Sequence, residues 1–158
     1  MRLRSTTLLQ VVTGFIGIGS LALLLWEPHI EGRNAHATLT DIYFRDPFLA
    51  YVYLGSIPFF IALYQAFRLL GWAGSREGAA SDRAIRAAHL IRNCTRVTVG
   101  FIVVGVATLM FVGEERPPVA FMGLVTTVAF LVIGASAAAL ERLLRGAVDL
   151  QSGNDLTA

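Results

Sequence analysis

Four long apolar stretches, separated by short polar segments, dominate the pattern along the chain. They cover residues 8–26, 48–70, 97–113 and 119–140, and none has a charged residue in its middle. A helix needs about 20 residues to cross roughly 30 Å of hydrocarbon. Because a backbone in lipid must satisfy its own hydrogen bonds, each stretch is predicted to be a transmembrane helix. The chain is therefore predicted to be an all-α polytopic membrane protein, an antiparallel four-helix bundle forming one membrane domain over residues 1–158.

The polar residues between the spans mark where the helices begin. Asp46 and Pro47 are typical of an N-cap followed by a proline at the first helical position, and Pro117 and Pro118 open the fourth helix in the same way. Ser81 and Asp82 are expected to cap a third helix that begins before the membrane and continues through Cys94. Pro58 lies inside the second span, where it is expected to kink the helix.

The fourth helix is predicted to continue past the membrane. Apolar residues recur at helical spacing after the span, with charged residues on the other faces. The apolar positions are Leu140, Leu143, Leu144, Ala147 and Val148. This amphipathic extension is predicted to end near Leu150, before a polar tail over residues 151–158.

The arginines predict the orientation. All thirteen basic residues are arginine. Ten of them flank the spans on the side of both termini and only three, Arg33, Arg45 and Arg116, lie on the other side. Because positive residues favour the cytoplasm, both termini, the loop 71–96 and the tail 141–158 are predicted to be cytoplasmic, and the loops 27–47 and 114–118 are predicted to lie outside. The first span is too long for a typical signal peptide, so we expect it to be retained.

Composition narrows the classes of function. The chain is 55% hydrophobic and 15% charged, with a mean hydropathy of +0.63. A soluble protein usually has about 25% charged residues, so the apolar excess is expected to contact the lipid bilayer. No basic stripe of the kind that binds nucleic acid is present, and direct nucleic-acid binding is not expected. Cys94, the single cysteine, excludes an internal disulfide.

The predicted outer side is acidic and contains two of the three histidines. His29, Glu31 and His36 are weak candidates for a metal or proton site, because imidazole and carboxylate groups are ligands of divalent cations. They lack the spacing of a helical metal motif, so a solvated acidic loop is the alternative.

A second polar cluster is predicted where the helices leave the membrane on the cytoplasmic side. It comprises Gln65, Arg68, Arg96 and Glu141. Because Glu141 is the acid at that end of a span, it is expected to pair with Arg68 or Arg96. The pair is either a structural lock or a switchable contact that couples the bundle to a partner.

The spans contain no histidine, no central acid and no lysine, and no phosphate-binding glycine loop is present. These absences argue against a haem ligated within the membrane, a proton relay and a nucleotide site. No cofactor is expected, and the protein is not predicted to be an enzyme.

Three segments resemble the YoaS-like family of bacterial inner-membrane proteins, a family with a domain of unknown function. They are Tyr43–Phe48, Phe59–Gln65 and the terminal Ala147–Thr157. The resemblance implies four helices in the bacterial inner membrane and no established activity. It also implies a family-wide polar tail, represented here by Asp149, Ser152, Asn154 and Asp155, although Gly153 stands where an acidic residue is common. The resemblance further implies that a gene for a small helix-turn-helix regulator often lies beside the genes of this family.

These observations favour a small membrane sensor or regulatory protein that engages a cytoplasmic partner, such as a helix-turn-helix regulator. The contact is expected to involve residues 76–96 and the partner-binding tail. One alternative is a structural or accessory subunit of a larger membrane complex, in contact with another membrane protein or a second copy of itself. Another is a transporter or immunity-type protein that binds a hydrophobic compound, which predicts an enclosed apolar pocket beside Pro58.

Overall fold

Helices make up nearly all of the described chain. A computed structural model describes residues 2–30, 38, 47–73, 82–112 and 116–155. Four helices lie in these ranges: α1 (Arg2–Ile30), α3 (Pro47–Ala73), α4 (Asp82–Val112) and α5 (Arg116–Asp155). Each contains a segment long and apolar enough to cross a membrane. The prediction of an all-α protein with four membrane-spanning helices is therefore confirmed.

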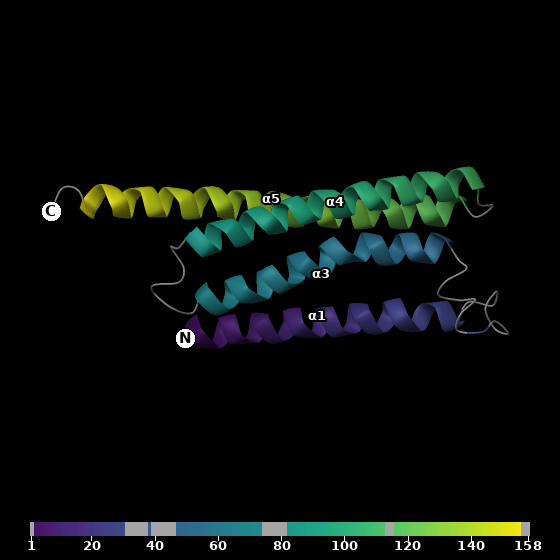
Figure 1. Cartoon of the computed structure of the whole chain (residues 1–158), viewed down its shortest axis with the longest axis horizontal. Coiled ribbons are helices and arrows are strands. Elements are labelled where there is room, and N and C mark those ends of the chain that lie inside the picture. Colours follow the sequence, from purple (N-terminus) through teal and green to yellow (C-terminus); the bar gives the residue numbers. More distant parts are fainter. Residues whose placement is uncertain (1, 31–37, 39–46, 74–81, 113–115, 156–158) are drawn as a thin grey trace.

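The helix boundaries follow the proline and cap signals. Helix α3 begins at Pro47, α4 begins at Asp82, and α5 begins at Arg116, directly before the two prolines. Helix α3 continues through Pro58, and Figure 1 shows a bend near its middle. Helix α5 reaches Asp155, five residues past its predicted end, so part of the expected polar tail is helical.

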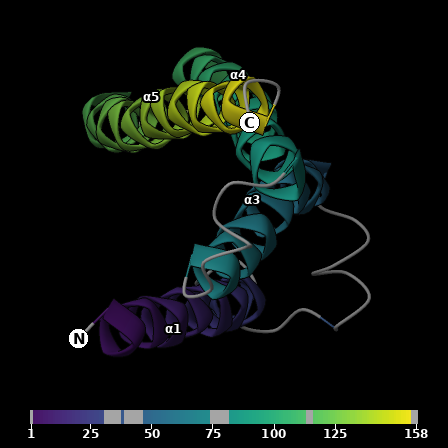
Figure 2. The ribbon, with the colours of Figure 1, turned by 90° about the vertical axis from the view of Figure 1, so that its left-hand side faces the viewer.

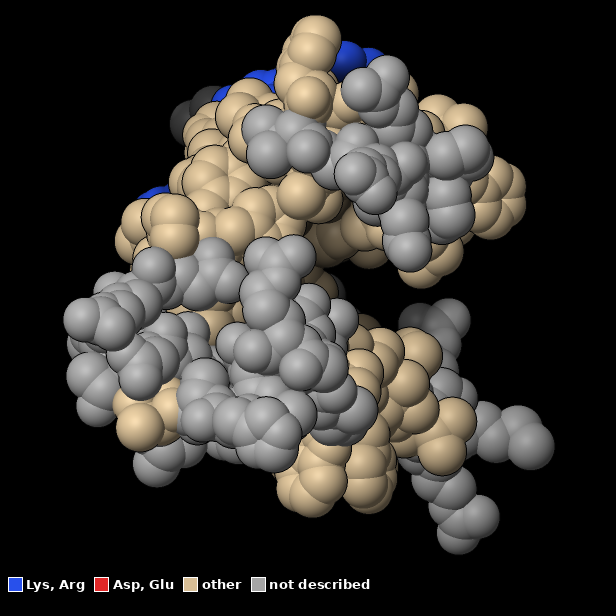
Figure 3. Space-filling view, turned by 90° about the vertical axis from the view of Figure 1, so that its right-hand side faces the viewer, with Lys and Arg blue, Asp and Glu red and all other residues tan. Residues whose placement is uncertain are grey.

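The helices pack mainly on their neighbours in the chain: α1 on α3, α3 on α4, and α4 on α5. Figure 2 shows α1 and α5 at opposite edges, with α3 and α4 between them. The arrangement fits a four-helix membrane bundle that is open along one side, and the hollow between the two edges is visible in Figure 3. Both chain ends lie at one end of the molecule, where α4 begins (Figure 1). We call this the arginine-rich end, because Arg83, Arg86, Arg92, Arg96, Arg142 and Arg145 belong to the helix segments there.

The tightest packing joins α4 to α5. A stripe of small or medium-sized residues on α4 is buried at helical spacing and consists of Ala84, Ala87, Ala88, Ile91, Cys94, Thr95 and Thr98. On α5, Gly134 faces Thr95 and Gly123 faces Val106, in the order that antiparallel helices require. A Cβ added to Gly123 would lie 2.3 Å from a Val106 methyl carbon, so this glycine allows a close approach of the two backbones.

Side chains that donate hydrogen bonds to backbone carbonyls join the other helices. Gln10 of α1 donates to the Phe67 carbonyl of α3 at 3.3 Å, and Tyr53 of α3 donates to the Leu24 carbonyl at 3.1 Å. Tyr51 of α3 donates to the Phe101 carbonyl of α4 at 2.7 Å. Interhelical bonds of this kind supplement van der Waals packing where lipid removes the hydrophobic driving force.

The outer surface is apolar. Large side chains such as Phe15, Leu23, Phe111 and Phe121 are at least 65% exposed, whereas the few buried side chains are mostly small and lie on α4 and α5. An exposed apolar surface of this extent is unsuited to water. The four helices therefore contact the lipid bilayer.

Candidate functional site

A buried carboxylate near the end of α5 is the centre of the main polar cluster. Glu141 is only 3% exposed and lies where α5 packs against the first turns of α4. The next turn of α5 supplies Arg145, whose Nη2 donates to Glu141 Oε1 at 2.7 Å. Helix α4 supplies Arg92, whose Nη1 lies 2.8 Å from Oε2. The carboxylate thus joins two helices at the arginine-rich end.

His89 completes this cluster from α4. Its Nδ1 lies 3.2 Å from Glu141 Oε1, and its Nε2 lies 2.9 Å from the Asn93 amide nitrogen. Arg92 Nη2 also lies 2.9 Å from the same Nδ1. If Nδ1 carries the proton, it donates to Glu141; if Nδ1 is unprotonated, it accepts from Arg92. One ring nitrogen cannot do both, so the proton position selects which neighbour His89 bonds.

The hydrogen bonding of this cluster is incomplete. Among the described residues, the buried Nε of Arg92 has no hydrogen-bond partner, and Oε2 of Glu141 has only the ion pair with Arg92. Buried ionic groups are stabilising when all their polar atoms are paired and costly when some are not. The ion pairs of the cluster hold α4 and α5 together, whereas its unpaired polar atoms are typical of a contact that can rearrange.

The predicted partner of Glu141 was wrong. Neither Arg68 nor Arg96 pairs with it in the part of the chain that the structure describes. Arg68 lies on α3, which packs mainly on α1 and α4, and its guanidinium lies over the rings of Tyr64 and Trp72 on the same helix. Arg96 is exposed and lies one turn beyond Arg92, about 6 Å further along α4. Gln65 on α3 is half-buried and outside the cluster.

Three members of the cluster, His89, Arg92 and Arg145, were absent from the predicted set. One signal was readable: Arg145 follows Glu141 at the i,i+4 spacing of a helical ion pair. His89 and Arg92 required the register of α4 against α5. Both residues lie in the helix that was predicted to begin near Asp82, but the sequence alone does not show which face of that helix packs against α5.

Two other predicted sites lie mostly outside the described side chains. His29 is in the last turn of α1, but its side chain is not described, and Glu31 and His36 are outside the described residues. Elsewhere, the described residues contain no group of three or more His, Cys, Asp or Glu residues suited to a metal ion. In the tail, Asp149 is exposed on α5; Ser152, Asn154 and Asp155 are helical, with side chains outside the description.

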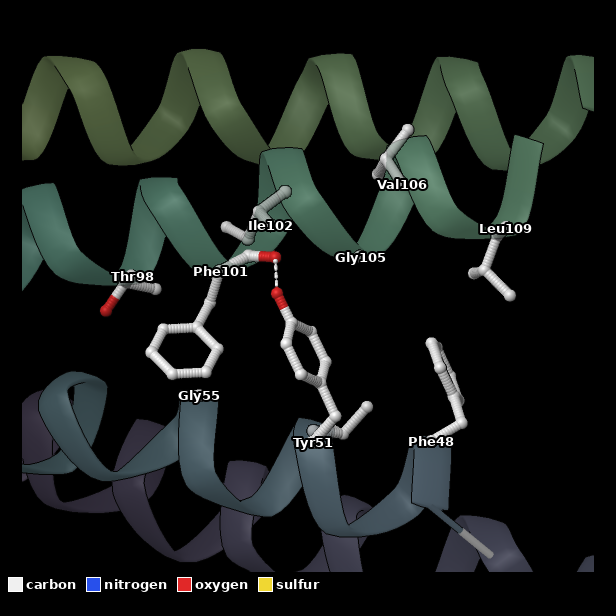
Figure 4. A pocket seen from close by; sticks show the side chains of 10 residues that line it. Phe48, Tyr51, Gly55, Thr98, Phe101, Ile102, Gly105, Val106 and Leu109 are labelled. Atoms are coloured by element: carbon white, nitrogen blue, oxygen red, sulfur yellow. Dashed lines mark hydrogen bonds between the residues drawn. The ribbon is translucent and has the colours of Figure 1, made fainter. Parts of the chain in front are cut away.

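An apolar cavity of about 220 Å³ lies between α3 and α4, toward the end opposite the arginine-rich end. Its walls include Phe48, Tyr51 and Gly55 of α3 and Phe101, Gly105 and Leu109 of α4 (Figure 4). The hydrophobic-compound hypothesis predicted an enclosed pocket beside Pro58. The observed cavity is open on one side, and its wall reaches Gly55, three residues before that proline.

Comparison with known proteins places the chain in a family. Residues 32–158 match the family described as a protein of unknown function (DUF2975). The chain is 34% identical over 160 residues to a protein named "uncharacterized membrane protein YoaS" from Bacillus subtilis (strain 168), with 99% of each chain covered. No solved structure matches. The resemblance inferred from the three sequence segments is confirmed, and the chain belongs to the DUF2975 family.

Proposed function

We propose that this protein is a small regulatory membrane protein that engages a soluble cytoplasmic protein through the end of α5. The observation that carries the proposal is the buried Glu141, which ties α5 to α4 at the point where both helices reach the arginine-rich end. An ion cluster buried between two helices is weak support for stability alone, because well-packed apolar residues often do as well. Such a cluster is better suited to selecting one position of α5 over another.

The surface that would contact the partner is the stretch of α5 after Glu141. Leu143 and Leu150 are 72% and 74% exposed, two turns apart on the face away from α4. Leu144 and Val148, by contrast, are half-buried. A 40-residue helix is about 60 Å long, twice the thickness of the hydrocarbon, so this end of α5 reaches beyond it unless the helix tilts strongly. Figure 1 shows α5 extending past the other helices at this end.

The test is a pull-down of the full-length protein in mild detergent, with mass spectrometry of the proteins that accompany it. We compare the wild type with Leu143→Asn/Leu150→Asn and with a deletion of residues 151–158. Leu8→Asn is the matched control, because Leu8 is an equally exposed leucine (66%) near the same end but on α1. The proposal expects a soluble protein that binds the wild type and the control but does not bind the double variant. The same soluble protein, once purified, should also bind the purified wild type.

The variant Glu141→Gln tests whether the cluster around Glu141 affects binding at this surface. If the cluster sets the position of α5, the variant changes the affinity for the same soluble partner although Leu143 and Leu150 are intact. The proposal fails if no soluble protein binds, or if the Leu143→Asn/Leu150→Asn variant binds it as well as the wild type does.

A second candidate is an accessory subunit of a larger membrane complex. The specific observation in its favour is the open side between α1 and α5, which a helix of another membrane protein could occupy (Figures 2 and 3). In the same pull-down, a fixed set of membrane proteins bound to every variant would favour this candidate over the first.

A further inference from the structure

The cavity between α3 and α4 has an uncharged lining. Its two hydroxyl-bearing residues are both engaged: Tyr51 donates to the Phe101 carbonyl at 2.7 Å, and Thr98 donates to the Cys94 carbonyl at 3.0 Å. No charged residue belongs to the wall. A cavity without free polar partners does not hold ordered water, so its occupant must be apolar.

The cavity is held open by the packing that surrounds it. The Tyr51 ring lies against Gly105, where an added Cβ would come within 3.1 Å of the ring. The Phe101 ring lies against Gly55 in the same way, since a Cβ added there would lie 3.0 Å from the ring. Each aromatic ring thus fills the hollow left by a glycine on the opposite helix. The hydrogen bond from Tyr51 fixes its ring there, so the ring cannot turn to fill the space toward Phe48 and Leu109 (Figure 4).

The dimensions and depth of the cavity indicate what fills it. Along α4, its wall runs from Thr98 to Leu109, a rise of about 16 Å. One leaflet of a bilayer has about 15 Å of hydrocarbon. The cavity begins at Phe48, the second residue of α3 and of its apolar span, and its long direction follows the helices. An opening on one side leaves it accessible from the lipid.

We infer that this cavity is a binding site for one acyl chain of a bilayer phospholipid. The chain enters beside Phe48, where the headgroup stays at the membrane surface, and extends between α3 and α4 toward Thr98. The site recognises an extended alkyl chain through shape and aromatic contact, because its wall holds no charged residue. This inference does not depend on the proposed regulatory function.

The test uses the full-length protein in mild detergent with an equimolar amount of phosphatidylglycerol carrying a diazirine on one acyl chain. After irradiation, mass spectrometry locates the adducts. We expect them to concentrate on residues 48–55 and 98–109 rather than on the equally apolar exposed faces of α1 and α5. Leu109→Trp, which fills the space, is expected to lower this labelling several-fold, whereas Val104→Trp, an exposed position on the same helix, leaves it unchanged.

Several results would overturn the inference. Adducts spread evenly over the four helices would show a general lipid contact, and undiminished labelling of Leu109→Trp would place the chain elsewhere. Stronger labelling by a compact diazirine hydrophobe without a long chain would assign the cavity to a small compound. If thermal unfolding shows that Leu109→Trp does not fold, Val52→Phe replaces it, because this substitution fills the same cavity from α3. If neither variant folds, the positions of the adducts on the wild type alone test the inference.

Discussion

Glu141 shows how one residue can determine the contact between two helices. Its carboxylate is almost fully buried, and its three neighbours, Arg92, Arg145 and His89, are all basic. Removing the acid would leave these basic groups facing each other without a counter-charge. The loss of one member of a buried ion pair typically costs about 3–5 kcal/mol, because the remaining charge has no partner.

Glu141→Gln is therefore expected to lower the free energy of unfolding by about 3 kcal/mol, since the amide keeps the shape but not the charge. The measurement is unfolding in detergent followed by circular dichroism. Arg96→Gln is the control, because Arg96 is exposed and outside the cluster, and its effect should stay within about 0.5 kcal/mol. Equal effects of the two substitutions would show that the cluster is not a stabilising contact.

Gly123 provides a second test at the scale of single residues. Gly123→Ala would place a methyl group 2.3 Å from the Val106 side chain, whose branched Cβ leaves it one preferred rotamer in a helix. We expect this overpacking to destabilise the protein by about 1–3 kcal/mol. Val106→Ala in the same chain should restore much of the loss.

The matched control for Gly123→Ala is Gly100→Ala. Nothing lies within 4 Å of a Cβ built at Gly100, so alanine there should be neutral or stabilising by up to about 1 kcal/mol. The free energy of unfolding of both variants is measured by unfolding in detergent. A Gly123→Ala protein as stable as the Gly100→Ala protein would contradict the close approach of α4 and α5.

At the scale of elements, α4 holds the molecule together. It packs on α3 at the aromatic pair of Tyr51 and Phe101, and on α5 where Thr95 faces Gly134. Helix α1, by contrast, packs mainly on α3, and none of the residues in its most apolar segment is buried. Among the described helices, the α4–α5 pair thus makes the most extensive contact, and α1 makes the least extensive one.

Cys94 reports on the packing around α4 without any added label site. It is 8% exposed and lies in the buried stripe of α4. We expect slow modification of native protein by N-ethylmaleimide. Glu141→Gln and Gly123→Ala should raise the rate several-fold, because both loosen the packing of the helix that carries the thiol. Fast labelling of the wild type, measured by mass spectrometry against time, would contradict the burial of Cys94.

At the scale of the whole molecule, the sequence predicted the helices better than their contacts. Apolar length and prolines identified the four spans, and helical spacing predicted the extension of α5, because these signals are local. The partners of Glu141 were predicted wrongly because they depend on which helix lies beside α5 and in what register. The glycines of the spans differ in the same way: Gly134 faces Thr95 and Gly17 faces Leu63, whereas Gly14 faces open space, and only the fold reveals this difference.

The register of α4 against α5 is the central claim, because it buries Glu141 and creates the surface proposed for the partner. A Cβ built at Gly134 lies 3.6 Å from the Thr95 Cβ, within the spacing of a disulfide. In a Cys94→Ser background, mild oxidation of membranes should therefore cross-link Thr95→Cys with Gly134→Cys. Thr95→Cys with Ile133→Cys should not cross-link, since Ile133 is exposed on another face of α5. Cross-linking of the second pair alone, or of both pairs equally, would contradict this register.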